Sequence, residues 1–528
     1  MSYIGKPPCD EGAVLSGAQL APCPAAAQRW TLVAAVLGSS MAFLDGTVVN
    51  VALPAIQRDL GATASQAQWV IEAYALFLAA LLLVGGVLGD RFGRRRVFMA
   101  GVALFTVAAA GCAFATSPGQ LIAARAVQGV GAALLVPGSL ALISAAFPQA
   151  QRGQAIGTWS AFSGIATAVG PVVGGFLIDH SSWTWAFLIN LPIGALLLVL
   201  CATKVPEFGA TQAQQPGLDV WGAALATVAL AGIVFALIEA PNLGWTAPAV
   251  VGAALAGVLA LALFVVVEAR SRAPMLPPAL LRIRNFAGAN LLTLLLYAGL
   301  GGGLYFFPLN LIQVQGYTAA AAGAALLPFI VIMFLLSRWA GQLVDRFGPR
   351  LPLMLGPLIA AAGFALFALP GVGGPYWTTF LPAVSVLGFG MAVTVAPLTT
   401  TVMNSVGPEL AGLASGVNNA VSRTGSLLAL AAFAVVMNSA FRPALASRIA
   451  ALHLPAEVQR AIEEQRTRLA AITIPSSVDQ ATASAIQRAV GDAFVAGFRR
   501  VMLVCAALAL LGALSAWALI RSEPPSGS

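Results

Sequence analysis

The chain has 528 residues, of which 59% are hydrophobic and only 9% are charged, and its mean hydropathy is +0.89. So few charged residues cannot cover the surface of a soluble protein of this length, so the composition indicates an integral membrane protein. The formal charge of +8 does not indicate nucleic-acid binding, because the arginines are scattered through short connectors and form no single basic patch.

The N-terminal 29 residues lack the features of a cleaved signal. They have no basic start followed by an apolar core and a small-residue cleavage site, so we expect a cytoplasmic tail over 1–29 and an uncleaved first apolar segment. The five cysteines have no metal-like spacing. We therefore expect neither a structural disulfide nor a metal site.

Fourteen apolar segments are long enough to cross a membrane, at about 20 residues for one crossing. In chain order they lie near 30–53, 67–88, 96–115, 120–146, 153–178, 184–203, 218–239, 247–268, 286–313, 322–343, 351–369, 376–400, 409–438 and 496–520. The short connectors at 89–96, 268–284 and 345–350 are rich in arginine, whereas the opposite short connectors hold Arg58 and almost no other basic residue. The positive-inside bias therefore predicts that both termini lie in the cytoplasm.

One connector on the outer side is long. Residues 439–492 contain a proline at a plausible first helical position and apolar residues at helical spacing, so we expect one or two amphipathic helices on the outer face. The simplest interpretation of this segment is a helical cap without a role in transport. The chain then ends in a short cytoplasmic tail over 521–528.

A ten-residue pattern occurs twice in the chain. Residues 86–95 read GVLGDRFGRR and residues 341–350 read GQLVDRFGPR, and both copies end an even-numbered segment. The duplicated halves therefore run parallel to each other. Eight crossings separate the copies where two six-helix halves would give six, which predicts six-helix bundles over 30–203 and 286–520 with two inserted helices over 218–268.

Four motifs, with a weaker fifth, carry a resemblance to a known family over nearly the whole chain. They are LDGTVVNVALP (44–54), GVLGDRFGRRRVF (86–98), LIAARAVQGVGAAL (121–134), GIATAVGPVVGGFL (164–177) and the weaker WTWAFLINLPIG (183–194). With these motifs the chain resembles the major facilitator superfamily, and within it the fourteen-span drug:proton antiporters. The expected fold class is an all-α membrane protein with the major facilitator fold. Thr184 departs from the pattern, because relatives usually have an arginine there.

Asp45 lies in the middle of the first apolar segment, where an acid costs roughly 2.5 to 3.5 kcal/mol. At 1.5 Å per residue, Asp45 lies roughly 13 Å from the outer end of its helix if that end is near Pro54, and Arg125 lies roughly 9 Å from the outer end of the fourth helix. We therefore predict that Asp45 and Arg125 face each other in the N-terminal half. Protonation of Asp45 would break this pair and bias inward against outward states. The alternative is a static ion pair that holds two helices together.

Three other residues bear on charge inside the membrane. Glu72 is a second intramembrane acid, which either attracts a cationic drug or takes a second proton, or else reaches the interface as a snorkelling carboxylate. The two histidines, His180 and His453, fall in predicted outer loops, so proton chemistry is expected to rest on carboxylates. Arg423 lies deep in the thirteenth segment without an obvious acid in its own half, and carbonyl groups and a substrate anion are both open as its partners.

The resemblance implies a cytoplasmic gate in the two copies of the repeat. Its residues are Gly86, Asp90, Arg91, Gly93, Arg94 and Arg95 in the first copy and Gly341, Asp345, Arg346 and Gly348 in the second. Here the glycines permit a close turn, the aspartates can satisfy a helix terminus, and the arginines can reach carboxylates or lipid phosphates. A purely topogenic charge would explain the arginines but not the matching second aspartate.

The resemblance also implies an antiporter motif on the fifth segment, formed by Gly170, Pro171, Gly174 and Gly175. Gly170 and Gly174 lie on one helical face and allow close backbone approach, and Pro171 weakens the helix locally. In the family this pattern marks antiporters in preference to importers. Tight packing without bearing on the direction of transport is the alternative.

By resemblance the chain is expected to be no enzyme but a proton-coupled antiporter in a bacterial cytoplasmic membrane. It would export amphipathic, cationic or neutral, drugs by alternating access, with the proton gradient in place of a cofactor. No G-x-x-x-x-G-K-[ST] phosphate loop is present, which argues against ATP as the energy source. A dedicated exporter of one metabolite or antibiotic is the alternative, and a membrane enzyme or sensor a remote one. We expect a monomer in the lipid bilayer that binds a small-molecule substrate and protons and does not bind nucleic acid. Whether it also requires a periplasmic adaptor protein is an open question.

Overall fold

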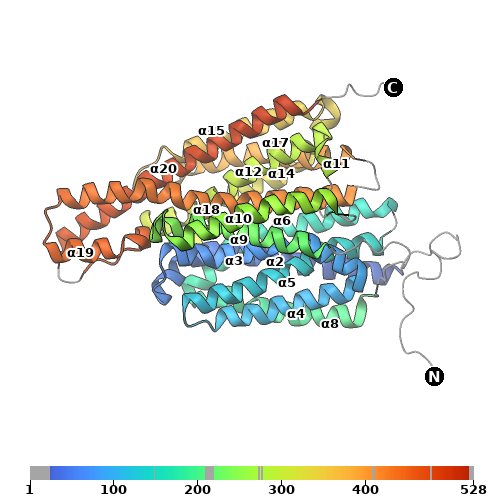
Figure 1. Cartoon of the computed structure of the whole chain (residues 1–528), viewed down its shortest axis with the longest axis horizontal. Coiled ribbons are helices and arrows are strands. Elements are labelled where there is room, and N and C mark those ends of the chain that lie inside the picture. Colours follow the sequence, from blue (N-terminus) through green and yellow to red (C-terminus); the bar gives the residue numbers. More distant parts are fainter. Residues whose placement is uncertain are drawn as a thin grey trace.

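The computed structural model of the chain describes residues 24–147, 149–207, 219–271, 274, 278–406, 411–475 and 478–521, and all the regular secondary structure among them is helical (Figure 1). The helices before residue 205 are α2 (Ala25–Leu60), α3 (Ala64–Phe92), α4 (Arg94–Ala113), α5 (Pro118–Ala146), α6 (Gln149–His180), α7 (Trp185–Leu188) and α8 (Asn190–Lys204). The next are α9 (Val220–Leu243), α10 (Pro248–Arg270) and α11 (Pro278–Leu281). The remaining elements are α12 (Arg284–Leu309), the π-helix η2 (Asn310–Val314), α13 (Ala319–Ala324), α14 (Leu327–Phe347), α15 (Arg350–Phe367), α16 (Tyr376–Thr379), α17 (Leu381–Asn404), α18 (Ala411–Ala451), α19 (Ala456–Glu464), the 3-10 helix η4 (Arg466–Ala471) and α20 (Gln480–Leu519).

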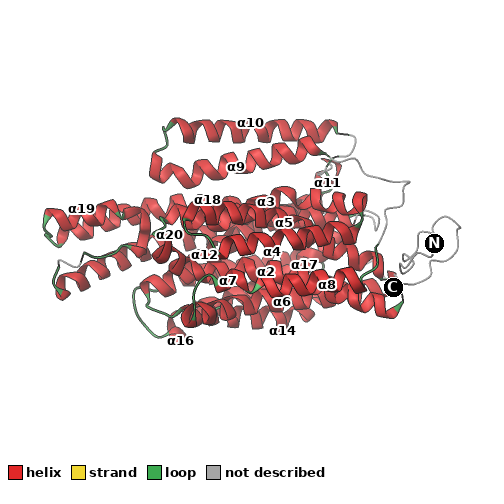
Figure 2. Cartoon of the chain, turned by 90° about the horizontal axis from the view of Figure 1, so that it is seen from below, coloured by secondary structure: helices red, strands yellow, loops and turns green. Residues whose placement is uncertain are grey.

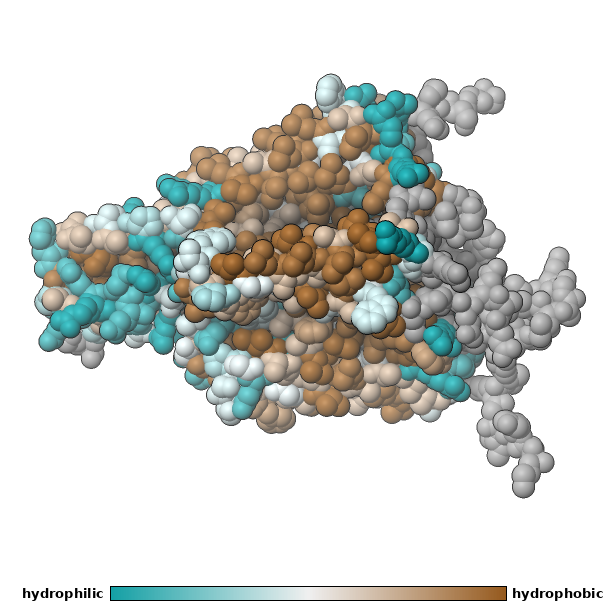
Figure 3. Space-filling model, in the orientation of Figure 1, coloured by the Kyte–Doolittle hydropathy of each residue, from teal (hydrophilic) through white to brown (hydrophobic). Residues whose placement is uncertain are grey.

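Thirteen helices in the described residues are long and apolar enough to cross a membrane, and a shorter apolar stretch, Ile165–His180, lies within α6. The predicted all-α membrane class is confirmed. Apolar side chains cover the middle of the face in Figure 3, and hydrophilic ones gather at its two ends. The spanning helices run along the long axis of the bundle, and we call the end with both termini the termini end and the opposite end the arm end (Figure 1).

The turn between α2 and α3 is closed by residues that cap both helices. Between α2 and α3, Gly61 takes a left-handed conformation (φ 62°), which glycine adopts without strain. Thr63 then forms a capping box with Gln66, in which each side chain accepts a hydrogen bond from the other residue's backbone N–H. A turn of three residues, 61–63, therefore suffices to reverse the chain.

The expected end of the first helix was wrong. Instead of ending near Pro54, α2 continues through it to Leu60, because a proline inside a membrane helix is tolerated where neighbouring groups compensate for the lost hydrogen bond. Asp45 thus lies about 22 Å from the end of α2, and Arg125 about 10 Å from the start of α5. Measured from these helix ends, the two depths are therefore not comparable, contrary to the estimate from the sequence.

Residues 439–492 form a helical extension, which we call the arm (Figure 1). The last part of α18 and the first part of α20 continue out of the bundle, and α19 and η4 connect them. Phe441, Leu445, Ile462 and Ile486 are buried in the arm, so it has an apolar core of its own. The arm is therefore built mainly from the extended ends of two spanning helices, and not from separate helices on the outer face as expected.

The helices before residue 205 pack mainly against one another, and so do those after residue 284. In the first group α5 contacts α3 and α4, and α2 contacts α6, while in the second group α15 contacts α17 and α12 contacts α20. Between them in sequence, α9 and α10 lie on one side of the bundle (Figure 2), where α9 contacts both α3 and α18. Trp69 Nε1 of α3 donates to Glu239 Oε1 of α9 at 2.9 Å, which ties this pair to the first group.

Polar contacts join the two groups at the arm end. Gln313 Nε2 donates to Gln57 Oε1 at 2.8 Å, and Gln68 Nε2 donates to the Leu430 carbonyl oxygen at 3.0 Å. The carboxylate of Asp179 on α6 accepts hydrogen bonds from the backbone N–H groups of Ala319 and Ala320 at 3.1 and 2.9 Å, capping α13 in the other group. The structure is therefore closed between the two groups at the arm end.

Candidate functional site

Asp45 is fully buried near the middle of α2, and three side chains donate to its carboxylate. Arg125 Nη1 of α5 donates to Oδ2 at 2.5 Å, while Gln128 Nε2 and Asn190 Nδ2 donate to Oδ1 at 2.9 and 3.0 Å. The predicted pairing of Asp45 with Arg125 is confirmed. The carboxylate faces the interior of the first helix group and not the lipid-facing surface.

Arg125 is held from several sides. It is 1% exposed, its Nε donates to the Val70 carbonyl oxygen at 3.0 Å, and its Nη1 also donates to Gln128 Oε1 at 2.7 Å. Its guanidinium group lies 4.3 Å from the centre of the Tyr74 ring, a cation–π geometry. A buried ion pair needs such additional contacts, because mutual attraction alone does not offset the cost of removing both charges from water.

The sequence analysis did not identify two of the three donors to Asp45. Gln128 lies one helical turn after Arg125 in the fourth-segment motif, and Asn190 lies in the weaker motif at 183–194. Both amides could have been recognised as candidate site residues, because each is a polar residue that interrupts an apolar run inside one of the family motifs. A polar side chain in such a run needs a partner, but the identity of that partner depends on helix packing.

Glu72 of α3 is fully buried, and neither of its carboxyl oxygens accepts a hydrogen bond from the described residues. The expectation of a carboxylate that reaches the interface is not met by this burial. Tyr305 of α12 lies close enough to interact electrostatically with it. A charged carboxylate without a hydrogen-bond donor among the described residues is costly at such a buried position.

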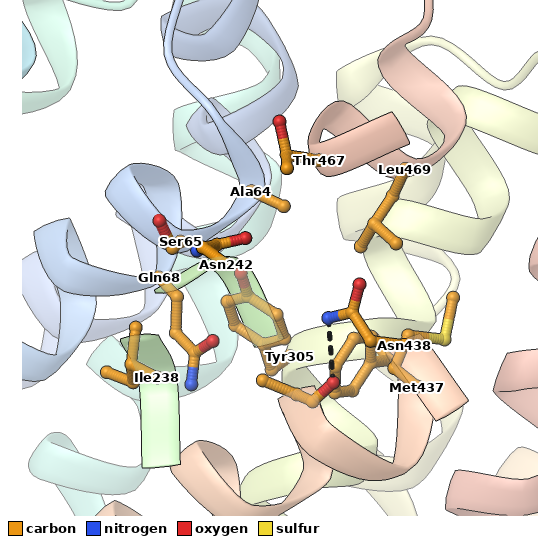
Figure 4. A pocket seen from close by; sticks show the side chains of 12 residues that line it. Ala64, Ser65, Gln68, Ile238, Asn242, Tyr305, Met437, Asn438, Thr467 and Leu469 are labelled. Atoms are coloured by element: carbon orange, nitrogen blue, oxygen red, sulfur yellow. Dashed lines mark hydrogen bonds between the residues drawn. The ribbon is translucent and has the colours of Figure 1, made fainter. Parts of the chain in front are cut away.

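A small cavity lies beside Gln68 (Figure 4), which is about one helical turn before Glu72 on α3. Its volume is about 20 Å³, enough for about one water molecule. Gln68 of α3, Tyr305 of α12, Asn438 of α18 and Thr467 of η4 are among the side chains that line it. Elements of both helix groups and of the arm therefore meet at this point.

A larger polar hollow, of about 960 Å³, opens at the arm end. Arg58, Asp179, Gln313, Tyr317 and Gln487 are among its lining residues. Because Gln313 and Asp179 also make the contacts between the two helix groups, this hollow lies next to the closure.

The first copy of the repeat forms a tight turn at the termini end. Gly93 has φ +100° and separates α3 from α4, as expected, whereas Gly86 lies inside α3 and not in the turn. Glu207, which the sequence analysis did not single out, accepts a hydrogen bond from the Arg95 backbone N–H at 3.1 Å and pairs with the Arg95 side chain at 3.4 Å. A side chain at Gly93 would be strained by the positive φ and would displace the carboxylate of Glu207. This turn is therefore clamped by the segment that follows α8.

The second copy has the same turn. Gly348 ends α14 with φ +72°, in the position equivalent to Gly93. Arg91 and Arg346 are also equivalent, and each lies over the ring of the phenylalanine that follows it. Arg94 Nη1 donates to the Ala141 carbonyl oxygen at 3.3 Å. Gly341 lies within α14. The side chains of Asp90 and Asp345 lie outside the described part of the structure.

The glycines of the fifth segment face two different helices. A side chain at Gly170 or Gly174 would collide with α2, near Thr47 and Val48. One at Gly175 would collide with the Ala319 backbone of α13, and α13 approaches in turn through Gly323, which lies against the Pro171 carbonyl group of α6. The motif thus allows close packing both inside the first helix group and across to the second.

The two histidines do not both lie in loops. His180 is the last residue of α6, and its ring stacks on Phe176 with a centroid distance of 4.2 Å. The helix extends to this residue because no proline or glycine follows Gly175 to end it earlier. His453 lies in the turn between α18 and α19, as expected.

A helical bundle with an apolar exterior and a fully buried, hydrogen-bonded ion pair defines a multi-pass membrane protein with a polar centre inside the bundle. The model of the Major Facilitator Superfamily matches residues 35–218 and 217–430. The chain belongs to this superfamily, and the recognition made from its motifs is confirmed.

Several relatives with assigned roles extend over most of this chain. It is 34% identical over 504 residues to the multidrug resistance protein Stp of Mycobacterium tuberculosis, covering 93% of this chain and 91% of that one. It is 33% identical over 500 residues to the tetracenomycin C resistance and export protein of Streptomyces glaucescens, covering 94% and 92%. The methylenomycin A resistance protein of Streptomyces coelicolor is 37% identical over 429 residues, covering 80% and 90%.

Solved structures share the fold. A bacterial homologue of the human lysosomal transporter Spinster, in an inward-facing and occupied conformation, has a TM-score of 0.63 and 18% identity and covers 95% of this chain and 98% of its own. The D-xylose–proton symporter has a TM-score of 0.58 and 15% identity, covering 94% and 98%. At this identity the likeness concerns the fold alone.

Proposed function

We propose that the chain is a proton-coupled exporter of amphipathic drug-like compounds, with Asp45 as the proton-binding residue. The observation that carries the proposal is the fully buried pair of Asp45 and Arg125. Intramembrane charges of this kind are costly and mark functional sites in transporters. The names of the relatives, which are resistance and export proteins, support the direction of transport.

The burial of Asp45 suggests how a proton could be coupled to movement. In this closed arrangement no face of the carboxylate is exposed, so a proton can reach it only when the helices move apart. Protonation would leave Arg125 as an uncompensated buried charge, which is strongly unfavourable. The protonated protein would then favour a different arrangement of the helices, in which water reaches Arg125. The proton would be released from Asp45 in that second arrangement.

We also propose that the termini end faces the cytoplasm. The connectors at this end carry Arg91, Arg94, Arg95, Arg96, Arg270, Arg284, Arg346 and Arg350, which the positive-inside bias places there. The arm and the polar hollow would then face outward, and the structure would be closed toward the outside. Proton release and substrate uptake belong to the cytoplasmic side in this arrangement, and the hollow would receive the released substrate.

A vesicle assay tests the proposal. Growth of a pump-deficient host on a panel of toxic compounds first identifies a transported one and separates broad export from export of a single metabolite. Adding that compound to everted vesicles with a preformed pH gradient should then collapse the gradient with the wild type and leave it intact with Asp45→Asn. Equal collapse by a folded Asp45→Asn variant would exclude Asp45 as the proton site. Co-purification from cross-linked membranes would report an adaptor protein or a second copy.

A further inference from the structure

We infer that Arg423 of α18 binds an anionic or strongly hydrogen-bond-accepting group of the transported compound, a role that deepens the function proposed above. Arg423 is half-buried within the spanning part of its helix, 12 residues from the start of α18 at Ala411. At the helical rise this is about 18 Å into the bundle from the termini end. A charged side chain at this depth in a membrane protein is energetically costly and marks a candidate functional site.

The surroundings of Arg423 are aromatic and come from both helix groups. Its guanidinium carbon lies 5.8 Å from the centre of the Phe43 ring on α2, which is two residues before Asp45. Tyr74 of α3 and Tyr297 of α12 lie near enough to interact with it electrostatically. Arg423 therefore points toward the seam between the helix groups and not toward the surrounding lipid.

The guanidinium group has unused hydrogen-bonding capacity. An arginine carries five N–H donors, yet within the described structure the Arg423 side chain makes no hydrogen bond or ion pair, and the ring it lies over is that of Phe43. Arg125 is the contrast, because the same type of side chain there has an acid, two acceptors and two rings around it. A structural arginine at this depth would be compensated in the same way. The free donors of Arg423 are consequently available to a ligand.

The chemistry of the site selects a class of compound. A guanidinium fork binds carboxylate, sulfonate or phenolate oxygens, and bidentate pairs of this kind are among the strong hydrogen bonds of proteins. The rings of Phe43 and Tyr297 suit a flat apolar body, whereas the Tyr74 ring is already covered by Arg125. A permanent cation would be repelled by the positive charge of Arg423. The site therefore fits aromatic or amphipathic acids, in place of the cations expected from the family resemblance.

Binding measurements with matched probes test this inference. We would use naphthalene-2-sulfonate, naphthalene-2-sulfonamide and 2-naphthyltrimethylammonium, which share one ring system and are anionic, neutral and cationic. Calorimetric titration of the protein in phosphatidylcholine nanodiscs should show the sulfonate binding most tightly. Arg423→Gln should weaken sulfonate binding by about 10-fold to 100-fold, as expected for loss of a hydrogen bond to a charged group, and leave the sulfonamide nearly unchanged.

Two further variants make the result decisive. Arg423→Lys keeps the charge without the planar fork and should fall between the wild type and Arg423→Gln. Arg448→Gln removes an arginine from the same helix in the arm, where it is 40% exposed, and should bind all three probes like the wild type. Absence of a sulfonate preference in the wild type, or an Arg423→Gln variant with unchanged preference and an unchanged unfolding temperature, would overturn the inference. Because binding at fixed pH does not require Asp45 to exchange its proton, these outcomes are separate from those of the vesicle assay.

Discussion

Asp45 of α2 and Arg125 of α5 form their ion pair inside one helix group and not between the two. The contacts that join the groups at the arm end come from other residues, among them Gln57 with Gln313 and Asp179 with α13. Breaking the ion pair therefore does not directly open a contact between the groups. Its effect on the conformation would have to come from the uncompensated charge that it leaves inside the first group.

The first prediction separates a coupling role of the pair from a static one. Asp45→Asn leaves Arg125 buried without its acid, which should destabilise the protein by about 3 to 5 kcal/mol. The double variant Asp45→Asn with Arg125→Gln removes both charges and should recover much of the lost unfolding temperature. We expect this double variant to remain inactive in the proton-gradient assay. Recovery of proton-coupled export along with stability would show that the pair only holds α2 and α5 together.

Glu72 is expected to act as a second proton carrier. Glu72→Gln keeps the shape of a protonated carboxyl group, so the unfolding temperature should change little. The variant should take up fewer protons for each molecule exported, measured by comparing a pH-sensitive dye with substrate flux in the same vesicles. An unchanged ratio would assign Glu72 to packing beside Tyr305.

The closure at the arm end should depend on a close approach of α6 and α13. Gly175→Val places a side chain against the Ala319 backbone and should cost about 1 to 3 kcal/mol of packing energy in this closed arrangement. Cysteine pairs across this contact would then cross-link more slowly, and export would fall. Gly252→Ala is a suitable control, because no atom lies within 4 Å of the added methyl group. Cross-linking at the wild-type rate in Gly175→Val would contradict the closure.

Asp179 gives a milder test of the same contact. Asp179→Asn keeps the capping geometry and removes the negative charge from the N-terminus of α13, where such a charge is stabilising by about 0.3 to 1 kcal/mol. We expect a modest shift toward the open arm end, detectable as increased labelling of a cysteine placed at Gln57. Reduced labelling would mean that Asp179 opposes the closure.

Charge movement distinguishes the compounds proposed for Arg423. Exchange of one sulfonate for one proton moves two positive equivalents inward, whereas exchange of the neutral sulfonamide moves one. Each charge contributes about 2.3 kcal/mol per 100 mV. Export of the sulfonate should therefore rise more steeply with an imposed potassium diffusion potential than export of the sulfonamide. Equal dependence for both probes would count against the exchange of an acid for a proton.

The membrane class, the spanning segments and the two charged residues at the centre of the site could be predicted from the amino-acid sequence. These are local properties: an apolar run of about 20 residues is a crossing wherever it lies, and a charge within it requires a partner. The repeat and its glycine turns could be predicted for the same reason, since φ +100° at Gly93 and φ +72° at Gly348 are conformations that favour glycine.

Which other side chains contact one another is set by the packing of the helices and could not be predicted from the sequence. The length of α2 beyond Pro54, the donation of Asn190 to a carboxylate 145 positions away and the clamp of Glu207 on the turn at Gly93 all depend on how the helices pack. The same holds for Asp179, whose partners on α13 follow it by 140 and 141 positions. A polar residue in an apolar run indicates that the residue has a partner. Which residue that partner is depends on the distances and angles between helices, and these cannot be predicted from one segment alone.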